Sequence, residues 1–155
     1  MTVRVLAVAA LLISGHFTPA AADSAVTVES AWARASIGMS RPAAAYATIR
    51  NDDDAPIALV GMQASISATA SIHESATDTD GIARMRPVDA LTVPAGGAVA
   101  LEPGGYHVML TGLTRPLVEG GTFAALFQFA DGTELSVMVP VLGIGAQGPE
   151  ETPAE

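Results

Sequence analysis

Residues 122–141 read TFAALFQFADGTELSVMVPV, and this stretch decides the fold class of the chain. Two runs of strand-forming residues, 122–129 and 134–141, lie on either side of Asp131-Gly132. An Asp-Gly pair between two such runs is a strong signal for a tight β-hairpin, because its backbone readily takes up positive φ. The sequence therefore predicts two antiparallel strands joined at Asp131-Gly132.

Similar segments continue towards the N-terminus. They are short, rich in Val, Ile, Thr and Ala, and separated every eight to twelve residues by Gly, Pro, Asn or Asp. This spacing predicts an all-β sandwich or barrel. The remaining expected strands are 26–35, 43–51, 57–64, 68–74, 82–86, 91–93, 98–101 and 107–113.

The first 22 residues have the form of a secretory signal peptide. Residues 1–4 carry a positive charge, 5–13 are apolar, and the segment closes with alanines 20–22. The apolar run is shorter than the roughly 20 residues of a membrane span, so cleavage after Ala22 is favoured over an uncleaved anchor. We expect a periplasmic protein with no stable membrane insertion after cleavage.

The mature chain is expected to form one domain, residues 23–142, followed by a disordered acidic tail, 143–155, rich in Gly, Pro and Glu. Without Arg4 it has six arginines, no lysine and sixteen acidic residues, a net charge of −10. This charge argues against nucleic acid and anionic membranes as partners. It suits a cation or a basic protein partner, but also a merely solvated surface. We expect a monomer.

The chain has no cysteine. It therefore has no disulfides, and its stability must come from the hydrophobic core. A blue-copper electron carrier is excluded on the same ground, because that centre needs a Cys thiolate. An enzyme is not expected either, since nothing in the sequence assembles a nucleophile with its base.

Two histidines remain after the leader, and both lie near methionines. The order is His73, eleven residues, Met85, twenty-one residues, His107, one residue, Met109. Two imidazoles and two thioethers form a soft, neutral ligand set that suits Cu(I) better than Zn²⁺, Mg²⁺ or Ca²⁺. Taken alone, each His could be a solvated surface residue and each Met a core residue, but the set uses both histidines of the mature chain. We therefore predict a copper site from these four residues.

Strand alternation predicts how the candidate ligands point. His107 and Met109 are two residues apart and share a face, which we expect to be the outer surface. Met85 lies between two arginines, Arg84 and Arg86, an unlikely setting for a core residue. Two roles are open for these arginines, a clamp on nearby carboxylates or a part in setting the phase of the strand. The core neighbours expected on the opposite face are Ile72, Tyr106, Val108 and Leu110.

The other methionines and two aromatic residues receive different assignments. Met62 and Met138 fall inside expected strands and are predicted to be core residues. Met39, in a Gly-Met-Ser loop, is a weak candidate for an auxiliary ligand. Trp32 and Tyr46 are predicted to anchor the interior of the sandwich.

The spacing of the four ligands resembles the signature of the periplasmic copper chaperone family of the PCuAC type. That signature is His-Met, ten residues, Met, twenty-one residues, His-x-Met. The resemblance covers about residues 26–141. The surrounding segments that carry it are AWAR at 31–34, AAYATIRN at 44–51, MRPV at 85–88 and PGGYHVML at 103–110. One position departs from the family, because Glu74 stands where a Met often follows the first His.

The resemblance implies a cupredoxin-like Greek-key β-sandwich. It further implies that Cu(I) binds at the surface through His73, Met85, His107 and Met109, with Cu(II) as a second possible state. The recipient would be a copper acceptor protein, either a respiratory oxidase subunit or a second copper chaperone. Glu74 could offer Cu(II) an oxygen or be a solvated surface residue. A copper-buffering tolerance protein and a structural β-sandwich without metal remain as alternatives.

Overall fold

Ten β-strands and no helix make up residues 25–149, the part of the chain that the computed structural model describes. That part accordingly has no helix long and apolar enough to span a membrane. The predicted signal peptide, residues 1–22, lies outside it. The strands are β1 (Val26–Arg34), β2 (Ala43–Asn51), β3 (Ile57–Ala64), β4 (Ser67–Thr77), β5 (Ala83–Pro87), β6 (Leu91–Val93), β7 (Gly97–Leu101), β8 (Tyr106–Leu113), β9 (Thr122–Phe129) and β10 (Glu134–Leu142).

The strand predictions are confirmed, and four of them match the observed bounds at both ends. The largest difference is β4, which continues to Thr77 and so enters the hairpin with β5. At the predicted β9–β10 turn, Gly132 has a φ of 91° and its N–H donates to Phe129 O at 3.0 Å. The Asp131 carboxylate accepts from Thr133 N at 2.8 Å. The Asp-Gly pair thus makes the turn that the sequence predicted.

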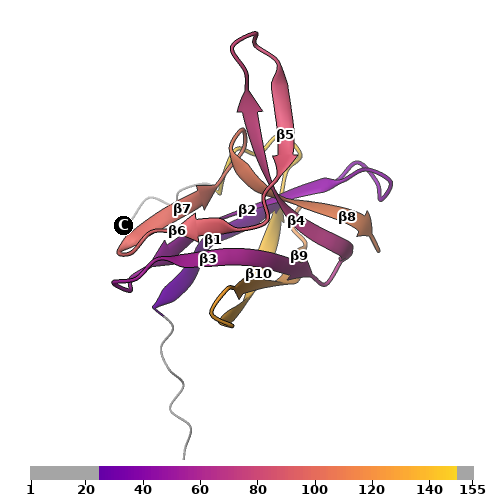
Figure 1. Ribbon diagram of the computed structural model, residues 1–155. Helices are drawn as coiled ribbons and strands as arrows, with labels where there is room; N and C mark the ends of the chain where they lie inside the picture. The colour runs from indigo at the N-terminus through magenta and orange to yellow at the C-terminus, as the bar shows by residue number, and fades with distance from the viewer. Residues whose placement is uncertain (1–24, 150–155) are drawn as a thin grey trace, which may run out of the picture.

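The strands form one mixed sheet that folds over on itself (Figure 1). Their order is β5-β4-β8-β7-β2-β1-β10-β9-β3-β6. The two halves meet where β1 runs parallel to β10, with Ala33 opposite Val141. Strand β8 also pairs with β2, so β4, β8 and β2 lie side by side. The result is the predicted all-β sandwich, with two sheet faces turned inward.

The hydrophobic core lies between the two halves. Ile49, Val108 and Leu110 come from one half, Leu59 and Val139 from the other, and all are almost fully buried. Burying a side chain of this kind contributes about 1.5–3 kcal/mol. Because the chain has no disulfide, this core is what holds the sandwich closed.

The two methionines predicted as core residues have different outcomes. Met62 is 5 % exposed and belongs to the core, as predicted. Met138 is 62 % exposed, so the prediction for it is wrong. The reason is strand alternation in β10: Val139 and Val141 face inward, which turns Met138 to solvent.

Trp32 and Tyr46 are buried, as predicted, but they do not lie inside the sandwich. They pair across β1 and β2 next to Ala33 and Ala45, whose side chains are in the core. Alternation therefore turns the two aromatic rings to the outer face of the sheet. The ring centroids are 4.4 Å apart, and the Arg34 guanidinium lies 5.6 Å from the centroid of Tyr46.

The first residues of the C-terminal segment form hydrogen bonds with β1 and with one another. Arg34 donates from Nε to Ala146 O at 2.7 Å and from Nη2 to Gln147 Oε1 at 3.2 Å. A turn closes between Gly143 O and Ala146 N at 3.0 Å. These bonds involve residues 143, 146 and 147, which fall in the segment 143–155 for which the sequence predicts a disordered tail. The rest of the predicted tail, 150–155, lies outside the described residues.

Candidate metal site

His73 and His107 face each other across two neighbouring strands. They are directly opposite in the antiparallel pairing of β4 with β8. Their ring centroids are 6.0 Å apart and their planes are inclined by 30°. The fold thus brings two imidazoles, thirty-four positions apart in sequence, to adjacent positions on one face.

The two methionines lie on the same face, one on each side of the histidine pair. Met109 is opposite Ser71, and Met85 is opposite Ser75. Since Ser71 and Ser75 are each two residues from His73, all these side chains leave the sheet on the same side. Such diagonal neighbours are roughly 7–8 Å apart, within reach of a long, flexible side chain. All four candidate ligands therefore share one face of β5, β4 and β8.

Exposure increases across this face. His107 is 6 % exposed, His73 and Met109 are intermediate, and Met85 is 55 % exposed. The predicted facing is right, because Val108 and Leu110 fill the core on the opposite side. The expectation of a solvent-exposed His107 is wrong.

The packing of β8 against β2 gives the reason for the burial of His107. Ala44 pairs with Met109 and Ala45 with Val108. Strand β2 therefore borders β8 on the side away from β4, up to Val108, the residue next to His107. Two ring pairs lie on the outer face, Trp32 with Tyr46 across β1 and β2, and His73 with His107 across β4 and β8.

His107 is held in a form that suits a metal ligand. Its Nδ1 lies 3.1 Å from Gly105 O. A carbonyl oxygen only accepts hydrogen bonds, so Nδ1 carries the proton and Nε2 keeps its lone pair. Metal-binding histidines typically donate their other ring N–H in this way, which fixes the tautomer and the ring orientation.

His73 has a buried nitrogen without a partner. Its Nε2 lies 3.0 Å from Ser71 Oγ, whereas Nδ1 is buried and forms no hydrogen bond. When Nε2–H donates to Ser71, Nδ1 is left with a free lone pair. Burial, and secondly the repulsion from His107, lower the pKa of His73 below its usual value. The ring is therefore neutral at physiological pH, the state in which an imidazole binds a metal.

The charged residues of the β4–β5 hairpin lie on its other face. Glu74 is next to His73 in β4 and so points to the opposite side, where Arg86 binds its Oε2 through Nη2 at 2.5 Å and Nε at 2.7 Å. Arg84 Nε binds Asp78 Oδ2 at 3.0 Å. The two arginines clamp carboxylates, one of the two roles left open from the sequence, and Glu74 offers no oxygen to the histidine face.

Met39 belongs to a different segment from the four candidate ligands. It is 51 % exposed and lies in the loop between β1 and β2, outside the three strands that carry the four ligands. Within residues 25–149 no group of three or more His, Cys, Asp or Glu side chains could hold a metal ion. The thioethers of Met85 and Met109 are the further soft donors that share the face of the histidine pair.

Sequence comparison relates the chain to a family of exported proteins. Residues 26–141 match the family model described as LpqE-like, a putative lipoprotein family. A putative lipoprotein of Leifsonia xyli subsp. xyli, Lxx21020, is 32 % identical over 125 residues, which cover 80 % of this chain and 74 % of the relative.

Solved structures share the fold. The apo PCuAC domain of PmoF2 superposes with a TM-score of 0.66, at 22 % identity over 80 % of this chain and 94 % of that domain. Apo-DR1885 of Deinococcus radiodurans gives 0.61, at 32 % identity over 96 % of this chain and 98 % of that protein. The Cu(I) form of DR1885 gives 0.59, at 36 % identity over 79 % and 83 % of the two chains. The predicted cupredoxin-like β-sandwich is thereby confirmed.

Proposed function

This chain belongs to the LpqE-like family and to the PCuAC-type copper chaperones, and we propose that it binds one Cu(I) ion through His73, Met85, His107 and Met109. The observation that carries the proposal is the direct pairing of His73 with His107, with a methionine diagonal to His73 on either side. The copper ion is the cargo of this protein, and the proposed role is binding and transfer without catalysis.

The chemistry of the four donors supports Cu(I) over harder metals. Thioethers and neutral imidazoles are soft or borderline ligands without charge, a set that favours Cu(I) and binds Zn²⁺, Mg²⁺ and Ca²⁺ poorly. On the histidine side, His107 offers Nε2 because Gly105 holds its Nδ1–H. His73 offers its unpartnered Nδ1. A copper ion would satisfy that buried nitrogen, which otherwise carries a desolvation cost.

We infer that the protein acts outside the cytoplasm and hands its copper to another protein. The lipoprotein relatives support an exported, envelope-associated protein, and the form of residues 1–22 supports export into the periplasm. The acceptor we propose is the copper centre of a respiratory oxidase or its assembly factor. A thioether cannot be oxidised to a disulfide, so this ligand set also suits an oxidising compartment.

A competition titration tests the binding site. The mature protein, residues 23–155, is titrated with Cu(I) against a chelator under reducing conditions. We expect one ion per chain, and X-ray absorption should show both nitrogen and sulfur scatterers. Met85→Ala and Met109→Ala should each weaken binding at least about tenfold. Met138→Ala is the matched control, because it removes an equally exposed thioether from another strand.

Pure nitrogen and oxygen coordination, or equal affinities in the Met85 and Met138 variants, would refute the site. A second experiment separates a chaperone from a copper buffer. The loaded protein is mixed with an apo fragment of an oxidase copper centre, and copper on each partner is measured after separation. A chaperone transfers the ion faster than free chelated copper does, whereas a buffer retains it.

A further inference from the structure

Met85 lies on β5, the strand that the packing of the sandwich restrains least. All five residues of β5 are exposed, and β5 is the edge strand of the sheet, paired only with β4. Figure 1 shows the β4–β5 hairpin projecting away from the body of the sandwich. The core therefore cannot fix the position of the Met85 thioether, although that sulfur has to reach the histidine pair.

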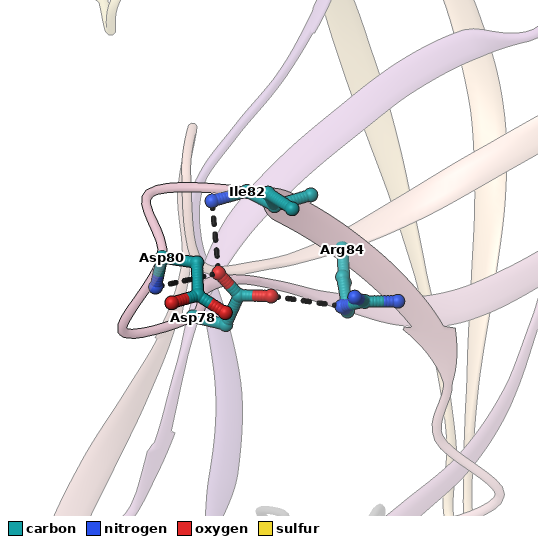
Figure 2. Close-up of polar contacts among 4 residues, drawn as sticks. All are labelled: Asp78, Asp80, Ile82 and Arg84. Atoms are coloured by element: carbon teal, nitrogen blue, oxygen red, sulfur yellow. Dashed lines mark hydrogen bonds and ion pairs between the residues drawn. The ribbon is translucent and has the colours of Figure 1, made fainter.

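The turn of this hairpin is organised by Asp78. Its Oδ1 accepts from the backbone N–H of Ile82 at 2.9 Å and of Asp80 at 3.1 Å, and its Oδ2 accepts from Arg84 Nε at 3.0 Å (Figure 2). The backbone of Asp78 bonds Ile82 O through its N–H and Gly81 N through its carbonyl. The Ile82 N–H foremost, and then Arg84, lower the pKa of the Asp78 carboxyl. One ionised side chain thus joins the end of β4 to the start of β5.

The contacts of Asp78 and Glu74 lie on either side of Met85 in β5. Arg84 precedes Met85 and is bound by Asp78, and Arg86 follows it and is bound by Glu74. Both arginine side chains point away from the histidine face, because their positions alternate with that of Met85. Their anchoring limits rotation and slippage of β5 without occupying any space on the ligand side.

We propose that Asp78, through Arg84 and the turn it closes, is a positioning residue for the Met85 sulfur, with the Glu74–Arg86 pair as the second anchor. The inference rests on the proposed copper site. Neither carboxylate touches the metal face. They act by keeping Met85 within reach of His73 and His107, which lowers the ordering cost when the ion binds.

The expected effect is moderate. Exposed ion pairs of this type are typically worth enough for about a two- to fivefold change in an equilibrium constant. Asp78 also holds two backbone N–H groups, so its loss should fall at the upper end of this range. We expect Asp78→Ala to weaken Cu(I) binding about fivefold. The apo melting temperature should change little, because the hairpin lies outside the core.

A double-mutant cycle tests the proposal in the mature protein. Cu(I) affinity is measured by chelator competition for wild type, Asp78→Ala, Met85→Ala and the double variant. If Asp78 acts through Met85, its substitution weakens binding in the wild type and has no further effect in the Met85→Ala background. Asp80→Ala is the matched control, because it removes the same charge from the same turn while Asp80 gives Asp78 only its backbone N–H.

The outcomes separate this inference from the proposed function. An equal loss in both backgrounds, or an equal loss in Asp80→Ala, would show a general charge effect and overturn the positioning role. So would an Asp78 variant with wild-type affinity while Met85→Ala binds weakly. If Met85→Ala itself binds like the wild type, the copper site is wrong. As a further readout, Asp78→Ala should show a reduced sulfur contribution in X-ray absorption, with the nitrogen contribution unchanged.

Discussion

Replacing His73 with phenylalanine should abolish copper binding and yet leave the apo protein about as stable as the wild type or more stable. The buried Nδ1 of His73 has no partner, and an unsatisfied buried polar atom costs about 1–3 kcal/mol. Phenylalanine removes this atom. It also removes the hydrogen bond between His73 Nε2 and Ser71 Oγ, which is worth about 0.5–1.5 kcal/mol. The difference predicts a free energy of unfolding from about 0.5 kcal/mol lower to about 2.5 kcal/mol higher.

The advantage of the variant should grow in acid. The pKa of His73 is lowered in the folded protein by burial and by His107, whereas in the unfolded chain it has its usual value near 6.5. Below about pH 6.5 the unfolded state therefore binds more protons, and the stability of the wild type falls as the pH drops. His73→Phe lacks this group, so its stability should vary less between pH 7.5 and 5.5.

Urea unfolding of the apo proteins, followed by circular dichroism at both pH values, measures this difference. His107→Phe is the control, because it removes the hydrogen bond to Gly105 but does not remove a buried nitrogen that lacks a partner. The Gly105 carbonyl still accepts from Ser75 N, so the control should lose only about 1 kcal/mol. A loss above about 1 kcal/mol in His73→Phe at pH 7.5 would refute the reasoning, because it would mean that Nδ1 is well bonded in the apo protein.

Three further predictions concern the hydrophobic core, the pH dependence of Cu(I) affinity and the fluorescence of Trp32. Met62→Ala should lower the free energy of unfolding by about 2–5 kcal/mol, whereas Met138→Ala should stay within about 0.5 kcal/mol of wild type in the same urea titration. Cu(I) affinity should fall from about pH 7 towards 5 without vanishing, because protons compete at the imidazoles and not at the thioethers; chelator competition at several pH values measures it. Trp32, the only tryptophan, should change its fluorescence when Cu(I) binds, because its ring partner Tyr46 lies on β2, which pairs with the strand of His107 and Met109; an unchanged spectrum of the loaded protein would contradict this.

The strands were predictable because their signals are local. Asp131-Gly132, the turn-forming Gly and Pro residues and the runs of β-branched residues each act within a few positions, and they predicted the place of all ten strands and both bounds of four. Which face of a strand points inward was harder to predict from the sequence. In β10 the apolar residues are nearly continuous from 135 to 142, so the alternation that exposes Met138 is not visible in the sequence. Only the pairing of β10 with β9 and β1 settles it.

The copper ligands could be named from the sequence, but their surroundings could not. Spacing and residue type single out the two His and two Met, whereas the burial of His107 depends on β2 packing beside β8, which no local pattern reports. The same holds for Arg34, whose bonds to Ala146 and Gln147 span more than a hundred residues and reach a segment whose composition predicts disorder. Contacts between distant segments set these features.

The four candidate ligands differ most in how firmly the fold holds them, and this difference predicts the order in which they release copper to an acceptor. His107 is buried and held by its hydrogen bond to Gly105, whereas Met85 is exposed on an edge strand that is anchored only by its hairpin. An approaching acceptor can reach Met85 first, and a thioether carries no charge that must be compensated when it leaves the metal. Displacement that begins at Met85 leaves the ion on the more rigid His107, so the exchange can proceed one ligand at a time.

If this order is right, Met85→Ala in the loaded protein should speed copper loss to a chelator more than Met109→Ala does, because the half-buried Met109 lies on the same strand as His107. Stopped-flow transfer rates for the two variants measure this, and a faster loss from the Met109 variant would reverse the order.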